Sequence, residues 1–517
     1  MSWDQETSKG RLAAEWKRLE STEFVIKKLT REMDLSNLGL NEGRLVHGTH
    51  IYNDIANFSE FLDSPLLRRD DSKRLHRLLH VIRTEQRRIA QFVLGGDKIQ
   101  IQGSKFHGLL YKPYDDDSEL AWSSVLSGVA LHHLLTRAVP VVFEGYPIPT
   151  STIGLDLGDS LVANIGVRGD RELISVGRPA NHAAKILGSP NAIVITPELY
   201  NCLRQEEQLH FIEDQDQNVF TLNLASLGDP EEAIQDAGFE WTIEDSIDYM
   251  TASLKALPLE DIVIEEARER IDPVCLGPKR AKSCDGGSIF VDLDGFTALV
   301  DNLVQTEDLT KLSRAVKWLH LFRYELGQVT ESDFDGITIQ HQGDRLLALF
   351  QTPTGNNGRI ARKVVDAAIS YNSSVEEVLN KHHAIFGPLH VAIGCAFGKT
   401  LVSRSGVRGD LDLTCLGRAT QRAEEIQLTL KGNEMGITPN IFEAINVDAI
   451  RDAFTFDNSN NFYIARALTW ASVENREREN QYKASSRAAY TPARTIAIGA
   501  AVGEGARALK VTRPWSE

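Results

Sequence analysis

The sequence predicts an α+β protein built from two tandem copies of one domain. Each half alternates short apolar strands with helical segments, and a long helical stretch follows the first strand of each half. Three separated motifs also recur at a nearly constant offset of 238 to 240 residues, which indicates an internal duplication. The matched pairs are Asp54 with Asp292, Gly103 with Gly343, and the GVRGD-containing runs at 166–186 and 406–426.

The repeats set the expected domain boundaries. Residues 11–34 have helical apolar spacing and are expected to pack on the first domain. A Pro/Gly/Lys-rich stretch precedes the second copy, and an Ala/Gly/Arg-biased tail ends the chain. We therefore expect an N-terminal helical segment (1–44), domain one (45–227), a connecting segment (228–284), domain two (285–467), and a C-terminal helical segment with a flexible tail (468–517).

Composition narrows the class of protein. The 517 residues are 42% hydrophobic and 25% charged, and the net charge of −16 argues against a nucleic-acid partner. The five cysteines are scattered and form neither a disulfide framework nor a zinc spacing. The N-terminus is polar, and no apolar run approaches eighteen residues. We expect a soluble, cytoplasmic protein without a membrane span.

Two segments of the second copy place carboxylates at strand ends. SIFVDLDGFT at 288–297 delivers Asp292 to the end of an apolar strand, and ITIQHQGDRLLALF at 337–350 places Asp344 at a bend between two strands. Two such carboxylates can hold two hard cations, Mg²⁺ or Mn²⁺, against a triphosphate. The backbone N–H groups at the following helix start, near Phe296 and Thr297, can receive phosphate oxygens.

Together these segments resemble the metal-binding half of class III nucleotidyl cyclases, enzymes that make 3′,5′-cyclic nucleotides. The likeness covers most of 45–225 and 285–445. It implies two ferredoxin-like domains paired head to tail as an intramolecular pseudo-dimer, with the active site in the cleft between them. It also implies a two-cation site at Asp292, Leu293 and Asp344.

The two copies have diverged in a complementary way. Domain one keeps Asp54 but has Ser104 where domain two has Asp344, so it would hold two cations poorly. Asp54 is interpreted as a relic, with a role in a degenerate second cleft for a regulator as the alternative. We therefore expect one competent site, with its metals on domain two.

Domain one is expected to supply the groups that stabilise the transition state. In cyclases an Asn and a basic residue four positions later do this work, and Asn181 and Lys185 match that spacing, although the usual Arg is replaced by Lys. Domain two has Gln421 and Glu425 there, and a Glu would repel a polyphosphate. The alternatives are a helix N-cap for Asn181 and a solvated surface residue for Lys185.

Base selection is expected from Tyr52, Gln100 and Ile174 of domain one. Neither the adenylyl nor the guanylyl pattern is present at these positions. Gln100 can pair with a carbonyl or an amino group, Ile174 offers no hydrogen bond, and Tyr52 can close the pocket or stack on a small base. The alternative for Tyr52 is a core aromatic at the domain interface. His107 could serve as a base, but a structural role is favoured for a lone histidine on an apolar strand.

The Tyr52 context, the Asn181–Lys185 helix and the GVRGDREL run resemble the pyrimidine cyclases of bacterial Pycsar anti-phage systems. The resemblance implies cyclisation of UTP, favoured over CTP, to a messenger that activates a separate effector. It also implies a monomer with an internal pseudo-dimer, or a homodimer. The alternatives are a purine cyclase with unorthodox base contacts and an inactive nucleotide sensor.

Overall fold

Two nine-stranded sheets with the same strand order form the centre of the protein. The computed structural model describes residues 2–33, 35–70, 72–167, 170–352, 357–407 and 409–489, so the predicted flexible tail lies outside the described residues. The first sheet runs β3-β4-β2-β5-β7-β9-β8, with β1 paired to β2 and β6 to β5, and the second repeats this order. The expected tandem α+β architecture is confirmed.

The strands of the first sheet are β1 (Val25–Lys28), β2 (Glu42–Ile55), β3 (Asp97–Gln102), β4 (Lys105–Leu110), β5 (Ser151–Val167), β6 (Asp170–Val176), β7 (Ile193–Ile195), β8 (Phe211–Asp214) and β9 (Val219–Leu222). Those of the second are β10 (Val263–Glu266), β11 (Arg280–Asp294), β12 (Ile337–Gln342), β13 (Arg345–Gln351), β14 (His390–Val407), β15 (Asp410–Leu416), β16 (Glu434–Ile437), β17 (Phe454–Asp457) and β18 (Phe462–Arg466). The predicted strand–bend–strand units are therefore the β3–β4 and β12–β13 hairpins.

The helices of the first half are α1 (Gln5–Glu20), α2 (Phe58–Asp63), α3 (Lys73–Arg88), α4 (Asp117–His133), α5 (Val139–Val142), α6 (Arg178–Lys185), α7 (Pro197–Cys202), α8 (Gln205–Gln208), α9 (Pro230–Asp236) and α10 (Ile243–Ala256). Those of the second are α11 (Phe296–Gln305), α12 (Leu309–Gln328), α13 (Asn357–Ser373), α14 (Asn380–His382), α15 (Arg418–Thr429), α16 (Pro439–Glu443), α17 (Asp448–Arg451) and α18 (Trp470–Ala489).

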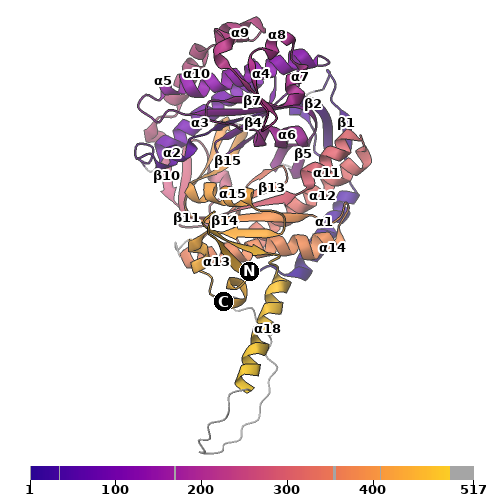
Figure 1. Ribbon diagram of the computed structural model, residues 1–517. Coiled ribbons are helices and arrows are strands. Elements are labelled where there is room, and N and C mark those ends of the chain that lie inside the picture. The colour runs from indigo at the N-terminus through magenta and orange to yellow at the C-terminus, as the bar shows by residue number, and fades with distance from the viewer. Residues whose placement is uncertain are drawn as a thin grey trace, which may run out of the picture.

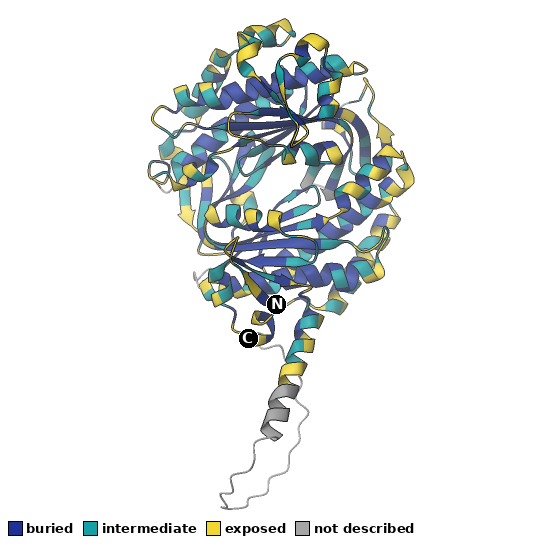
Figure 2. Cartoon of the chain, in the orientation of Figure 1, coloured by how far each residue is buried: buried dark blue, intermediate teal, exposed yellow. Residues whose placement is uncertain are grey.

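The helices divide between the outer and inner faces of the sheets. Figure 1 shows α3, α4 and α10 outside the first sheet, α13 outside the second, and α6 and α15 between the two sheets. The central strands of each sheet are mostly dark blue in Figure 2 because helices or the opposite half cover both faces. Since side chains alternate along β2, His50, Tyr52 and Asp54 share one face of that strand.

The N-terminal helix differs from the expectation in extent and in partner. It spans Gln5–Glu20 rather than 11–34, and Val25–Lys28 forms β1, which pairs in parallel with β2. It packs on α12 of the second half instead of on domain one, with Leu12 fully buried. The strand at Val25–Lys28 forms because it pairs with β2, and whether such a short segment becomes a strand depends on the neighbour it packs against rather than on its own sequence.

The counterpart of α1 in the second repeat is α10, which precedes β10 in the chain and packs on α3 of the first half. The matching residues keep the offset of 238: Trp3 with Trp241, and Ser8 with Ser246. The Ser8 hydroxyl donates to Glu325 at 2.7 Å, and the Ser246 hydroxyl donates to Glu85 at 2.5 Å. The first helix of each repeat thus donates a hydrogen bond to a buried glutamate of the other repeat, and these two contacts join the halves.

A buried ion pair stabilises the first of these contacts. Arg11 makes two bonds of 2.7 Å to Glu325, whose side chain is fully buried, and reaches Asp333 at 2.9 Å. We expect Arg11→Met to lower the free energy of unfolding by about 3–5 kcal/mol, because it leaves a buried carboxylate without its counter-ion. Arg18→Met removes an ion pair with Glu15 in which Arg18 is half-exposed, so it should lower the free energy of unfolding by at most about 1 kcal/mol. Urea titration of both variants measures the two losses. Equal losses in the two variants would contradict this assignment.

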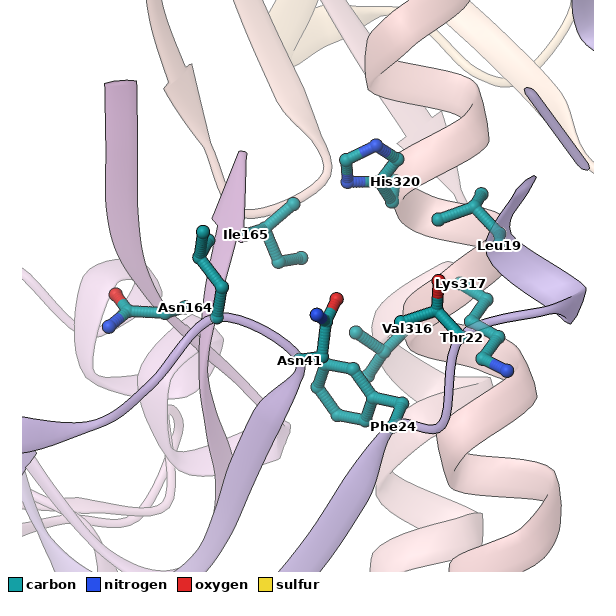
Figure 3. A pocket seen from close by; sticks show the side chains of 10 residues that line it. Leu19, Thr22, Phe24, Asn41, Asn164, Ile165, Val316, Lys317 and His320 are labelled. Atoms are coloured by element: carbon teal, nitrogen blue, oxygen red, sulfur yellow. The ribbon is translucent and has the colours of Figure 1, made fainter. Parts of the chain in front are cut away.

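A small cavity of about 20 Å³ remains where the N-terminal segment, β5 and α12 meet (Figure 3). It has room for about one water molecule. Its lining residues are Leu19, Thr22, Phe24, Leu40, Asn41, Asn164, Ile165, Val316, Lys317 and His320. The seam between the halves is therefore nearly filled at this point.

One helix in the described part of the chain, Asp117–Val142, is long and apolar enough to cross a membrane. However, 72% of its apolar window is buried inside the protein. That burial is typical of a core helix.

Candidate active site

The two predicted metal carboxylates lie on adjacent strands of the second sheet. Asp292 is near the end of β11, and Asp344 is in the tight turn between β12 and β13. Asp292 is in register with Arg345, and Asp344 immediately precedes Arg345 in the turn, so the charge of Asp292 acts on Asp344. Both nearby turns use a glycine in the left-handed region, Gly295 at φ +82° and Gly343 at φ +63°, where other residues would be strained.

The carboxylates repel each other. Burial, and then the negative charge of Asp292, raise the pKa of Asp344 to about 8. Thr297, the second residue of α11, places its hydroxyl 3.5 Å from Asp344 Oδ2. A divalent cation between the carboxylates would relieve this repulsion, so the donor chemistry fits the expected metal.

Asp292 is held by two residues that sequence reasoning missed. Gln427 donates from Nε2 to Asp292 Oδ2 at 3.3 Å and accepts from Arg345 Nη2 at 2.8 Å. Arg345 Nε lies 3.8 Å from Asp292 Oδ1. Burial raises the pKa of Asp292, and the positive charge of Arg345 opposes that rise. The position of Arg345 directly after the bend was a sequence signal, but Gln427 had none.

The number of protein ligands available for a cation is small. No group of three or more His, Cys, Asp and Glu side chains converges anywhere in the part of the chain that the structure describes. The Leu293 side chain is buried and apolar, so only its backbone carbonyl could coordinate. The remaining ligands would be phosphate oxygens and water, as is usual for Mg²⁺.

Helix α6 of the first half faces these carboxylates. The Lys185 ammonium is near enough to Asp292 to lower the pKa of that carboxyl, against the larger effect of burial. The backbone N–H of Arg178 donates to Asp301 of α11 at 3.2 Å, so the two helices meet across the cleft. Asn181 is inside α6, whose N-cap is Gly177, and the N-cap alternative for Asn181 is therefore wrong.

The predicted base residues lie in different environments. Tyr52 is 7% exposed, and its pKa is raised by burial and influenced by the charges of Arg345 and Asp344 across the cleft. Gln100 donates from Nε2 to the backbone carbonyl of His341, so its amide is engaged at the interface. Ile174 is buried in an apolar cluster that includes residues of α11 and α12. Phe296 belongs to the same cluster, so only its backbone could meet a substrate.

The symmetry-related cleft is open and has Ser104 in place of the second metal carboxylate. It has a cavity volume of about 180 Å³ and includes Asp54, Ser104 and Glu425 in its lining. The Ser104 hydroxyl donates to Asp54 Oδ1 at 2.6 Å, so one oxygen of this carboxylate already accepts a hydrogen bond from the protein. Nearby, Glu424 pairs with Lys105 at 2.9 Å. The cleft therefore lacks a counterpart of Asp344, and its positive charge at Lys105 is already paired with Glu424.

Similar proteins support the interpretation of this geometry. A uridylate cyclase from Pseudomonas aeruginosa is 27% identical over 447 residues, which is 84% of each chain. A uridylate cyclase from a Rhizobium species is 24% identical over 432 residues, covering 76% of this chain and 78% of that one. No family model matches the chain.

A solved structure decides the fold. The crystal structure of a class III adenylyl cyclase-like ATP-binding protein from Pseudomonas aeruginosa superposes with a TM-score of 0.77 at 24% identity, over 92% of this chain and 99% of that chain. The chain therefore has the fold of this class III adenylyl cyclase-like protein, and it is similar over most of its length to the two uridylate cyclases.

Proposed function

We propose that this cyclase converts UTP to 3′,5′-cyclic UMP and pyrophosphate at one composite site. Domain two (285–467) would hold two Mn²⁺ or Mg²⁺ ions at Asp292, Asp344 and the Leu293 carbonyl. Domain one (45–227) would supply Asn181 and Lys185 for the transition state and Tyr52, Gln100 and Ile174 around the base. The observation that carries the proposal is that α6, which contains Asn181 and Lys185, meets α11 of the second half, where the backbone N–H of Arg178 donates to Asp301 at 3.2 Å.

The names of the relatives support the choice of a pyrimidine, because both similar cyclases described above are named uridylate cyclases. Tyr52 supports it as well, since a bulky ring in the cleft leaves room for a smaller base. CTP is the closest alternative, because the Gln100 amide can serve either pyrimidine.

The reaction is an in-line transfer at the α-phosphorus. The 3′-oxygen loses its proton and forms a bond to the α-phosphorus, while the bond to the pyrophosphate oxygen breaks. The cations, when bound, make the 3′-hydroxyl more acidic and neutralise phosphate charge. Lys185 and Asn181 would stabilise the charge that develops on the α-phosphate and the leaving group. Phosphate oxygens can also accept from the backbone N–H groups of Phe296 and Thr297 at the start of α11.

The product would act as a messenger in anti-phage defence, through a separate effector protein in the cytoplasm. The chain would work as a monomer with its internal pseudo-dimer, or as a homodimer of such units.

The test is the product that the full-length protein forms from equimolar ATP, GTP, CTP and UTP with Mn²⁺, resolved by liquid chromatography and mass spectrometry. We expect cyclic UMP as the main product. A preference for ATP or GTP would overturn the pyrimidine assignment, a preference for CTP would correct only the base, and no turnover would favour the nucleotide sensor.

A further inference from the structure

A hydrogen-bonded pair of histidines lies beneath the base-binding side of the active-site cleft. His50 Nδ1 is 2.9 Å from His107 Nε2, and His50 Nε2 is 3.1 Å from Ser160 Oγ and 3.3 Å from Ser175 Oγ. His50 is fully buried and His107 is 3% exposed. These residues come from four adjacent strands of the first sheet, namely β4, β2, β5 and β6.

Both imidazoles are neutral. Burial lowers the pKa of His50 to about 3 and the pKa of His107 well below its ordinary value. Each neutral ring has one donor and one acceptor nitrogen, so the pair and the two hydroxyls can satisfy one another in either direction along the chain. The hydrogen bonds of the network therefore form between neutral groups, and they fix the orientation of the two imidazole rings.

Tyr52 rests directly on this network. Its ring is stacked on His107 with a centroid separation of 4.2 Å and an interplanar angle of 13°. The two residues are also in register across β2 and β4. A ring held flat against a hydrogen-bonded neighbour has little rotational freedom, so its position is set before any base arrives.

The second repeat lacks this network. At the matching positions it has Ser288 for His50, Leu347 for His107 and Cys415 for Ser175, and Phe290 replaces Tyr52. The register agrees, because Phe290 pairs with Leu347 as Tyr52 pairs with His107. The histidine pair therefore occurs only in the half that faces the metal carboxylates.

We propose that His50 and His107 are positioning residues that fix the Tyr52 ring and thereby set selection of a pyrimidine over a purine. The inference rests on the proposed function, since it concerns the base pocket of that site.

The test replaces His107 with its counterpart from the second repeat. In His107→Leu we expect the ratio of kcat/KM for UTP to that for ATP to fall at least about tenfold, because the Tyr52 ring can then turn aside. Most of the loss should come from a higher KM for UTP. His107→Phe keeps a flat ring under Tyr52 and should recover most of the selectivity, and His50→Ser should have a smaller effect of the same sign.

The control is another buried histidine in the same half. His133 of α4 is 4% exposed, and neither of its ring nitrogens has a hydrogen-bond partner among the residues that the structure describes. α4 lies on the outer face of the sheet, away from α6 (Figure 1). His133→Leu should therefore leave the UTP-to-ATP ratio unchanged.

The outcomes separate the two proposals. If the wild type prefers UTP, an unchanged ratio in a folded His107→Leu protein would overturn the role of the pair and leave the proposed function standing. If the wild type forms no cyclic pyrimidine product, the proposed function fails first. Should His107→Leu unfold, His50→Ser carries the test, and an unchanged ratio in that variant overturns the inference.

Discussion

Asp344→Asn is expected to reduce turnover at least about 10³-fold while the protein stays folded. Asn is nearly isosteric with Asp but carries no charge, so it cannot hold a cation against the triphosphate. The measurement is kcat with Mn²⁺ at saturating nucleotide, alongside the thermal midpoint. An unchanged rate would refute the assignment of the metal site to domain two.

The same substitution should also change how stability depends on pH in chelator-treated protein. The folded-state pKa of Asp344 is about 8, above its ordinary value of 3.8. A raised carboxyl pKa contributes stability that is fully present below pH 3.8 and is lost as the pH rises toward 8. Asp344→Asn lacks this loss, so its thermal midpoint should rise relative to wild type as the pH increases over that range.

The matched control is Asp54→Asn in the second cleft. Asp54 occupies the position equivalent to Asp292, but it accepts a hydrogen bond from Ser104, which stands where domain two has Asp344. If it is a relic, the variant should keep wild-type turnover. A large loss would instead assign the second cleft a part in activity.

Lys185→Met is expected to lower kcat about 10²- to 10³-fold with a small change in KM. The ammonium is exposed at the end of α6 and faces the buried carboxylates, so its charge can act on the α-phosphate and on the leaving pyrophosphate. Lys185→Arg should retain most of the activity, because it keeps the charge and resembles the usual residue of this family.

Glu425→Met supplies the control for Lys185, because Glu425 is the equivalent residue of the second repeat and pairs on the surface with Arg422. It should turn over at the wild-type rate. Full activity in Lys185→Met would show that the chemistry does not depend on this half of the molecule, and the shared site would have to be abandoned.

The duplication, the strand–bend–strand units and the two carboxylates were predictable because they depend on local sequence. Local sequence is enough to predict a carboxylate at the end of an apolar strand or a glycine in a tight turn, because neither depends on how the domain packs against its neighbours. The GVRGD repeat fixed the correspondence between the halves, and with it the complementary losses at Ser104 and Glu425.

The errors and omissions concern contacts between residues far apart in the chain. The helix expected at 11–34 is shorter and packs on the opposite half, and Gln427 holds Asp292 from 135 residues away. His107 seemed to be a lone histidine until the fold paired it with His50 and stacked it against Tyr52. No spacing within one segment predicts such a network.

By itself, the sequence determined the repeated α+β architecture and which half contains the paired carboxylates, because period, turn chemistry and residue identity are local properties. Only the tertiary structure decided that α6 with Lys185 meets α11 of the other half, that the leading helix of each repeat packs on the opposite half, and that His50 and His107 pair behind the Tyr52 ring. These features come from packing between the two sheets, where the choice of partner depends on burial and charge in three dimensions.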